Sequence, residues 1–214
     1  MTANLRHIAL AGGILALFAV VGTGLVALTH EATDERITEN RRAATLETFH
    51  ELIPEERYDN DPVADAITVT APEALGSKDP LTVYRARRDG EPVAAVLTAV
   101  APDGYGGPIR LLVAVNRDGT LAGVRVVNHS ETPGLGDAIE ADRSDWIQDF
   151  VGRSLGDPPR EDWRVEKDGG VFDQFTGATI TPRAVVAAVR RALTYFENHR
   201  RELFARGASA EEER

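Results

Sequence analysis

The segment over residues 8–29 most constrains how this chain can fold. It contains no charged residue and is rich in alanine, leucine, valine and glycine. As an α-helix it would extend about 33 Å, enough to cross a hydrocarbon core of about 30 Å. A cleaved signal peptide is the alternative, but its apolar stretch usually covers only about 7–15 residues. Because no small-x-small cleavage site follows Thr29, we expect residues 1–30 to form an uncleaved transmembrane anchor.

The charges that flank this segment leave its orientation open. Arg6 precedes it, and Arg36, Arg41 and Arg42 follow it. This distribution of lysine and arginine does not place the amino terminus inside, and the positive-inside rule loses force when a long domain follows the helix.

The composition of the remaining chain excludes several classes of function. The formal net charge is -10, and all acidic residues follow Thr29. Binding to phosphate backbones requires a positive field, so we expect no nucleic-acid partner. The chain has no cysteine, which excludes disulfides, thiolate metal sites and cysteine-ligated iron–sulfur clusters. A redox function would therefore need a different cofactor.

Residues 31–75 are expected to form an amphipathic helix and a linker. Apolar residues recur at near-helical spacing over residues 34–53, and Pro54 should end the helix. The apolar positions are Ile37, Leu46, Phe49, Leu52 and Ile53. Such a helix can pack onto the following domain or connect it to the membrane.

Residues 76–206 are expected to form one domain of the α+β class, with an antiparallel sheet packed against helices. Asp89-Gly90 and Asp118-Gly119 are typical of tight hairpin turns because glycine adopts positive φ without steric cost. Leu112 and Ala114 make the second face of the sheet apolar, so a helix or loop should cover it. The expected strands are residues 81–87, 93–100, 109–116, 121–128 and 163–167.

Two helices are expected towards the end of this domain. Ser144 is a suitable cap for a short helix that contains Trp146 and Phe150. A longer helix should run over residues 182–204, with Thr181 as its N-cap and Pro182 in its first position. Residues 207–214 are small and acidic and are expected to be a disordered tail.

The stretch before the last helix carries the most informative motif. Asp173, Thr176, Gly177, Ala178 and Thr179 resemble the Asp-x-x-(Ser/Thr)-Gly-Ala-Thr motif of the FMN-binding domain family. On spacing alone, an ordinary loop capped by Thr181 is the more common explanation of these residues. The resemblance implies that a flavin transferase moves FMN from FAD onto Thr179 as a phosphoester. It also implies that Asp173 belongs to the transferase's recognition sequence and that Thr176, Gly177 and Ala178 lie beside the cofactor.

A second segment resembles the same family. Residues 131–136 read Glu-Thr-Pro-Gly-Leu-Gly, which is similar to a family loop that lies against the flavin. The resemblance implies flavin contacts from Glu131, Thr132, Gly134 and Leu135. The Gly-Tyr-Gly-Gly sequence at residues 104–107 matches as well, and neither a metal site nor a catalytic residue is implied.

The whole chain resembles the family of G subunits of Rnf (also called Rsx) electron-transport complexes. That resemblance implies an electron-carrying subunit, with covalent FMN, in a multi-subunit complex of the bacterial inner membrane. The complex would move electrons between ferredoxin and NAD, coupled to ion translocation, and the soluble domain would face the periplasm. Two alternatives remain: the equivalent FMN-bearing protein of the sodium-translocating NADH:quinone reductase, and a membrane-tethered binding or scaffold domain that never receives flavin.

Overall fold

The computed structural model describes the backbone of residues 2–205 and the side chains of residues 7, 10–26 and 42–205. Helix α1 spans Thr2–Leu52, and the chain divides into two compact units, Met1–Thr45 and Leu46–Arg214. The predicted tail, residues 207–214, lies outside the described residues.

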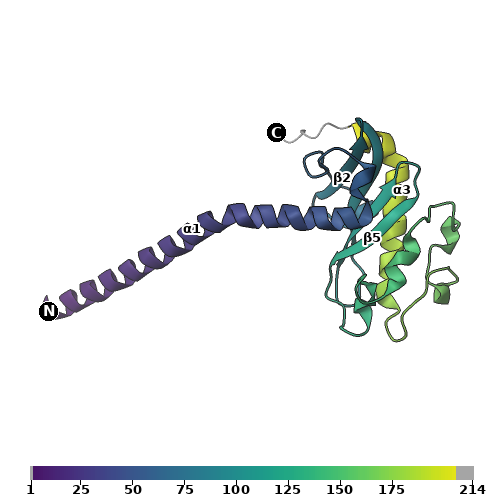
Figure 1. The fold of residues 1–214 in the computed structure, drawn as a ribbon. Helices are drawn as coiled ribbons and strands as arrows, with labels where there is room; N and C mark the ends of the chain where they lie inside the picture. Colours follow the sequence, from purple (N-terminus) through teal and green to yellow (C-terminus); the bar gives the residue numbers. More distant parts are fainter. Residues whose placement is uncertain (1, 206–214) are drawn as a thin grey trace. The chain divides into compact units, whose positions relative to one another are not determined.

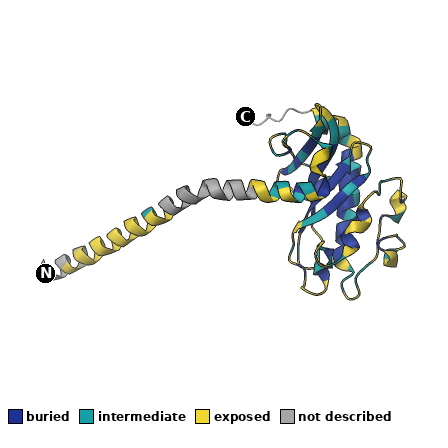
Figure 2. Ribbon diagram, viewed as in Figure 1, coloured by how far each residue is buried: buried dark blue, intermediate teal, exposed yellow. Residues whose placement is uncertain are grey.

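The first unit consists of helix α1 up to residue 45. Its described side chains over residues 10–26 are almost all exposed, as Figure 2 shows. Within the described part of the chain, we find no helix that combines the length and the apolarity needed to cross a membrane. The predicted anchor includes residues 8, 9 and 27–29, whose side chains lie outside the described residues.

The second unit is built on a five-stranded antiparallel sheet in the order β1-β2-β3-β4-β5 within the described residues. Figure 1 shows its strands in the compact part of the chain. Asp89 and Gly90 have φ angles of 52° and 79°, which suits the tight turn between β2 and β3. Strands β4 and β5 also pair antiparallel, and Gly119 in the turn between them has a φ of 98°, so both predicted hairpins are confirmed. The strands are β1 Ile67–Val69, β2 Leu81–Arg88, β3 Glu91–Ala101, β4 Ile109–Asn116 and β5 Leu121–Asn128.

Two groups of apolar side chains cover the two faces of this sheet. Helix α3, Ile180–Ala205, packs on one face and contributes to the larger core. Phe49, Leu52 and Ile53, at the end of α1, cover the other face. They bury Leu112 and Ala114, so the expectation that this second apolar face would be covered is confirmed.

An arginine pair joins the end of α3 to β2. The buried guanidinium of Arg85 donates to the Leu203 carbonyl at 3.1 Å and to the Asp65 carboxylate. Arg87 donates to the same carboxylate at 2.7 Å and to the Phe204 carbonyl at 2.7 Å. Burial lowers the pKa of Arg85, while Asp65 opposes that shift. The two guanidinium groups thus satisfy carbonyls that the helix end leaves free.

The segment between β5 and α3 differs from the prediction. The expected strand over residues 163–167 is wrong, because short 3-10 helices flank Trp163 and only an isolated bridge joins Val165 to Phe172. The Trp163 indole N–H donates to the carbonyls of Ser154 and Pro158, both at 3.1 Å. Burial of Trp163 among loops therefore replaces strand pairing.

The helix start near the motif also differs from the prediction. Helix α3 begins at Ile180, and the Thr179 carbonyl accepts the Arg183 N–H at 3.3 Å. Thr181 is therefore inside the first turn rather than its N-cap. The predicted Ser144 cap is confirmed, since its hydroxyl accepts the Trp146 N–H at 3.2 Å, although the helix it starts is 3-10. The remaining helices are α2 Pro72–Leu75, η1 Glu55–Arg57, η2 Gly136–Ile139, η3 Asp145–Phe150, η4 Arg160–Asp162 and η5 Glu166–Asp168.

Candidate functional site

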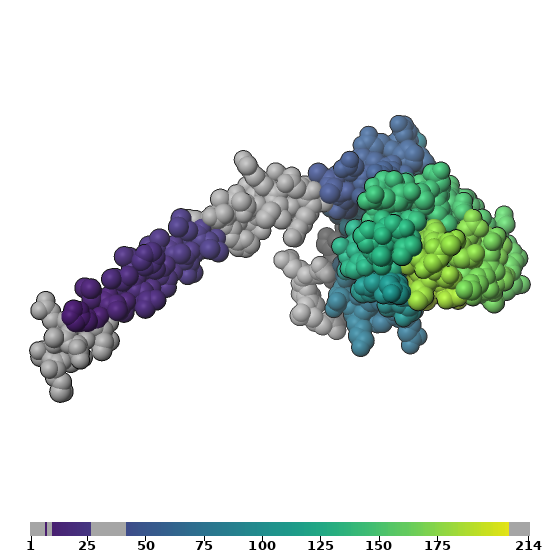
Figure 3. All heavy atoms as spheres, turned by 90° about the horizontal axis from the view of Figure 1, so that it is seen from below, coloured from purple at the N-terminus to yellow at the C-terminus, as the bar shows by residue number. Residues whose placement is uncertain are grey.

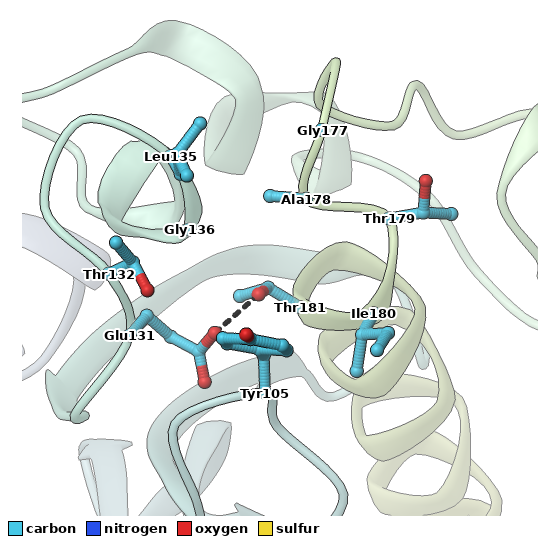
Figure 4. A pocket seen from close by; sticks show the side chains of 10 residues that line it. All are labelled: Tyr105, Glu131, Thr132, Leu135, Gly136, Gly177, Ala178, Thr179, Ile180 and Thr181. Atoms are coloured by element: carbon cyan, nitrogen blue, oxygen red, sulfur yellow. Dashed lines mark hydrogen bonds between the residues drawn. The ribbon is translucent and has the colours of Figure 1, made fainter.

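The segment after β5 and the segment before α3 meet around a cavity of about 270 Å³ (Figure 4). These two segments also lie side by side on the surface in Figure 3. Small-molecule sites usually occupy about 300–1,000 Å³, so this cavity encloses only part of a cofactor-sized ligand. The lining residues are Tyr105, Glu131, Thr132, Leu135, Gly136, Gly177, Ala178, Thr179, Ile180 and Thr181.

A tight turn forms one wall of the cavity. The Ala178 N–H donates to the Phe175 carbonyl at 3.1 Å, and Gly177 has a φ of 84°. A turn with positive φ at its third residue favours glycine there. In Figure 4 the small Ala178 side chain points towards Leu135. The turn thus presents little side-chain bulk to the cavity.

Thr179 connects this turn to α3. It is half-buried and immediately precedes the first helical residue. In Figure 4 its side chain points away from Glu131 and Leu135, towards the outer side of the segment. The first N–H groups of a helix have no intrahelical partner and carry partial positive charge. A group bonded to the Thr179 hydroxyl would therefore start at the cavity rim beside a site that favours anions.

Glu131 forms the part of the cavity wall that is next to the first turn of α3. It is 5% exposed. Its Oε1 accepts the Gly106 N–H at 3.0 Å, and its Oε2 accepts the Thr181 hydroxyl. Both carboxylate oxygens are thus engaged by the protein.

His129 contacts the backbone of Glu131 and does not line the cavity. Its Nδ1 accepts the Glu131 N–H at 3.0 Å. Because Nδ1 acts as the acceptor, the ring proton is on Nε2, which lies 2.5 Å from Glu140 Oε1. His129 lines a separate groove that begins at β5.

The structure brings together most of the residues predicted from the motifs. Glu131, Thr132, Leu135, Gly177, Ala178 and Thr179 line the cavity, whereas Gly134 and Thr176 do not. Asp173 is exposed, and its backbone carbonyl accepts the Trp146 indole N–H at 2.9 Å. Gly136, expected from the loop motif to let the backbone approach a flat ring, lines the cavity as well, whereas the sequence did not indicate Ile180 or Thr181 as cavity residues. Tyr105 was detectable only through the Gly-Tyr-Gly-Gly match.

The chemistry of these residues fits FMN. Tyr105, Leu135 and Ile180 are 70%, 45% and 46% exposed, and together they offer apolar surface that a flat ring can cover. The start of α3 offers N–H groups to a phosphate. Among the described residues no cluster of side chains suited to a metal ion occurs. The exposed apolar side chains and the start of α3 suit an organic, phosphate-bearing cofactor.

Comparison with known proteins agrees with this chemistry. The family model for the FMN-binding domain matches residues 104–194, and the model for the RnfG N-terminal region matches residues 1–52. A Pseudomonas aeruginosa protein is 52% identical over 192 residues, covering 90% of each chain. Proteins from Shewanella oneidensis and Vibrio cholerae are each 48% identical, covering 94% and 90% of this chain and 94% and 91% of their own.

All three relatives are named as the G subunits of ion-translocating oxidoreductase complexes. Identity near one half over nine-tenths of each chain is ample for a family assignment. This chain belongs to the family of G subunits of ion-translocating oxidoreductase complexes and contains the FMN-binding domain of that family.

Proposed function

We propose that this protein is an electron-carrying subunit of a membrane-bound Rnf-type complex, with FMN bonded to Thr179 through a phosphoester. The main support is the position of Thr179, which stands at the rim of the cavity and directly before α3. The match to the FMN-binding domain includes both walls of that cavity. The name of the relatives supports assembly into an ion-translocating complex.

Attachment would use the Thr179 hydroxyl. In the transfer from FAD, the hydroxyl oxygen forms the new bond to the FMN phosphorus, AMP leaves, and the hydroxyl proton is lost. The phosphate would then lie near the positive end of α3, where an anion is stabilised. Arg183, in the same first turn, donates to Asp168 at 2.6 and 2.8 Å, so the N–H groups at the helix start are the donors that we assign to the phosphate.

Recognition by the flavin transferase would involve Asp173. Its side chain is exposed and its backbone is held by the Trp146 indole. Trp146 also contacts Phe175, with ring centroids 5.2 Å apart. The aromatic contacts would therefore present Asp173 at a fixed distance from Thr179.

The protein's contribution to electron transfer would be placement rather than acid–base chemistry. Bound FMN accepts one or two electrons and can thus connect carriers of different electron number. Tyr105, Leu135 and Ile180 would cover part of the ring and exclude water from it. No side chain at the cavity needs to act as a nucleophile towards a substrate, in keeping with a carrier inside a larger enzyme.

We further propose that residues 1–30 anchor the protein in the bacterial inner membrane and that the FMN-binding domain lies in the periplasm. The uncharged composition of residues 8–29 supports the anchor. In this arrangement the partners are the other subunits of the complex, which passes electrons between ferredoxin and NAD and couples them to ion translocation.

The first test is the intact mass of the protein purified from membranes that contain an active flavin transferase. We expect the wild type to carry the added mass of one FMN and Thr179→Ala to carry none. Thr194→Ala, a change within α3 of a threonine whose hydroxyl donates to the Arg190 carbonyl, is the control and should keep the FMN. An unmodified wild type would refute the proposal and favour a scaffold that never receives flavin.

A further inference from the structure

The carboxylate of Glu131 is buried without a cationic partner. The residue is 5% exposed, and among the described side chains no arginine, lysine or histidine forms an ion pair with it. A buried charge is tolerated only where hydrogen bonds replace the lost water. Those bonds come from the Gly106 N–H and the Thr181 hydroxyl.

These two donors come from different walls of the cavity. Gly106 belongs to the loop before β4 and directly follows Tyr105, whereas Thr181 lies two residues after Thr179 in the first turn of α3. Glu131 itself follows β5. Figure 4 shows its carboxylate beside the Tyr105 ring and bonded to Thr181. One side chain therefore joins three segments that surround the cavity.

The surroundings leave the carboxylate little freedom to move. A Cβ added at Gly104 would stand 2.7 Å from Glu131 Oε1, and one added at Gly136 would stand 2.9 Å from Oε2. Both distances are far below van der Waals contact, so these glycines pack directly against the carboxylate. Its backbone is also fixed, because the Glu131 N–H donates to His129 Nδ1 at 3.0 Å.

We propose that Glu131 is a positioning residue rather than a ligand of the cofactor. Its carboxylate holds the Tyr105 loop and the start of α3 at a fixed separation, which determines how a ring attached at Thr179 lies against Tyr105. The identity of the attached group rests on the proposed function. The three-way connection itself is a property of the flavin-free protein.

Three substitutions distinguish the effect of the two hydrogen bonds from the effect of the negative charge. In Glu131→Gln the amide oxygen can accept the Gly106 N–H and the amide nitrogen can donate to the Thr181 hydroxyl, so both connections survive without charge. Glu131→Ala removes both connections. Thr181→Val removes one of them at nearly constant volume. Ser130→Ala is the control, because Ser130 is adjacent and its side chain takes no part in these bonds.

The experiment is hydrogen–deuterium exchange on the full-length, flavin-free protein. Glu131→Ala should raise exchange by about tenfold at the Gly106 amide, which loses its buried acceptor, and at the Arg183 and Ala184 amides, because the first turn of α3 loses the bond from the Thr181 hydroxyl to Glu131. Thr181→Val should affect the Arg183 and Ala184 amides alone. Glu131→Gln and Ser130→Ala should match the wild type. Unchanged exchange in Glu131→Ala, or a Glu131→Gln variant as labile as Glu131→Ala, would overturn the proposal.

The FMN-loaded protein supplies an independent second readout. Intact mass measures how much FMN is attached, and flavin fluorescence anisotropy measures how firmly the ring is held. Glu131→Gln should load FMN as the wild type does and show the same flavin fluorescence anisotropy. Glu131→Ala should give a lower anisotropy, because its ring would lie free of Tyr105. If the wild type never acquires FMN, the proposed function fails, while the exchange measurements still decide the role of Glu131. If Glu131→Ala does not fold, Thr181→Val and Glu131→Gln carry the test.

Discussion

Gly177 occupies the third position of the turn that precedes Thr179, and its φ of 84° lies in the left-handed region. Only one atom, Leu135 Cδ2 at 3.8 Å, approaches the position where a side chain would begin. The need for glycine is therefore conformational rather than a matter of space. The turn directs the chain into α3, so this backbone angle contributes to the placement of Thr179.

We expect Gly177→Ala to lower the free energy of unfolding by about 1–2 kcal/mol, the cost of a left-handed conformation for a residue with a Cβ. Gly156→Ala is a matched control, since Gly156 has open space and no positive φ. Urea denaturation of both variants measures the difference. Equal midpoints for the two variants would show that the turn relaxes without cost.

The role of Glu131 shows what the sequence could and could not reveal at single residues. The motif resemblance indicated that Glu131 belongs to the site, and the structure places it in the cavity wall. Its hydrogen-bond partners lie 25 and 50 residues away along the chain. Such separations leave no local pattern, so a cofactor contact and a positioning role were indistinguishable before the fold was known.

At the level of elements, the sequence predicted what local chemistry determines. Asp-Gly pairs and alternating apolar residues were sufficient for both hairpins, and β4 and β5 have the predicted limits. Strand β1 spans only Ile67–Val69 and depends on pairing with β2. The segment around Trp163 has strand-like alternation but no continuous partner strand. Whether β1 and the segment around Trp163 form strands therefore depends on contacts with residues that are distant in the sequence.

The connection between β2 and the end of α3 depends on Arg85. We expect Arg85→Ala to lower the free energy of unfolding by about 1–3 kcal/mol, because the buried Leu203 carbonyl and one oxygen of Asp65 lose their donor, while Arg87 still donates to the other Asp65 oxygen. Arg117→Ala is the control: its ion pair with Glu91 is exposed, with 3.6 Å between the charged atoms, and should contribute about 0–1 kcal/mol. Similar losses in both variants, measured by urea denaturation, would contradict the argument.

The contact between α3 and η5 should depend on pH. The hydrogen bonds from Arg183 lower the pKa of Asp168 below its ordinary value of 3.8. A carboxyl group whose folded-state pKa is lowered contributes stability above its unfolded-state pKa, and that contribution disappears as the pH falls through the folded-state pKa. We therefore expect the ion pair to persist at neutral and mildly acidic pH and to open only below the ordinary aspartate range.

The carboxyl carbon shift of Asp168, followed by NMR during an acid titration, measures this directly. Asp168→Asn supplies the control, in which hydrogen exchange over residues 166–170 should lose the corresponding pH dependence. A midpoint at or above 3.8 would mean that Arg183 does not hold the carboxylate in solution.

On the scale of the whole molecule, helix α1 belongs to both compact units. The boundary between the units falls at residue 45, seven residues before the helix ends at Leu52. Large apolar side chains within residues 10–26 are exposed, among them Leu15 and Phe18 at 71% and 73%. Exposed apolar stretches of this kind mark a membrane or partner contact, which supports the proposed anchor. Phe49, Leu52 and Ile53 instead complete the core of the second unit.

Two truncations test this division of α1. We expect the chain Leu46–Arg214 to fold with the same urea midpoint as the full-length protein in detergent, because both apolar core clusters lie inside it. A chain that begins at Pro54 loses three buried side chains, each contributing about 1.5–3 kcal/mol. That loss approaches the total stability of a typical domain, about 5–15 kcal/mol. The shorter chain should therefore be largely unfolded or aggregated, since Leu112 and Val96 would face water. An unchanged midpoint in the shorter chain would show that the end of α1 is dispensable to the domain.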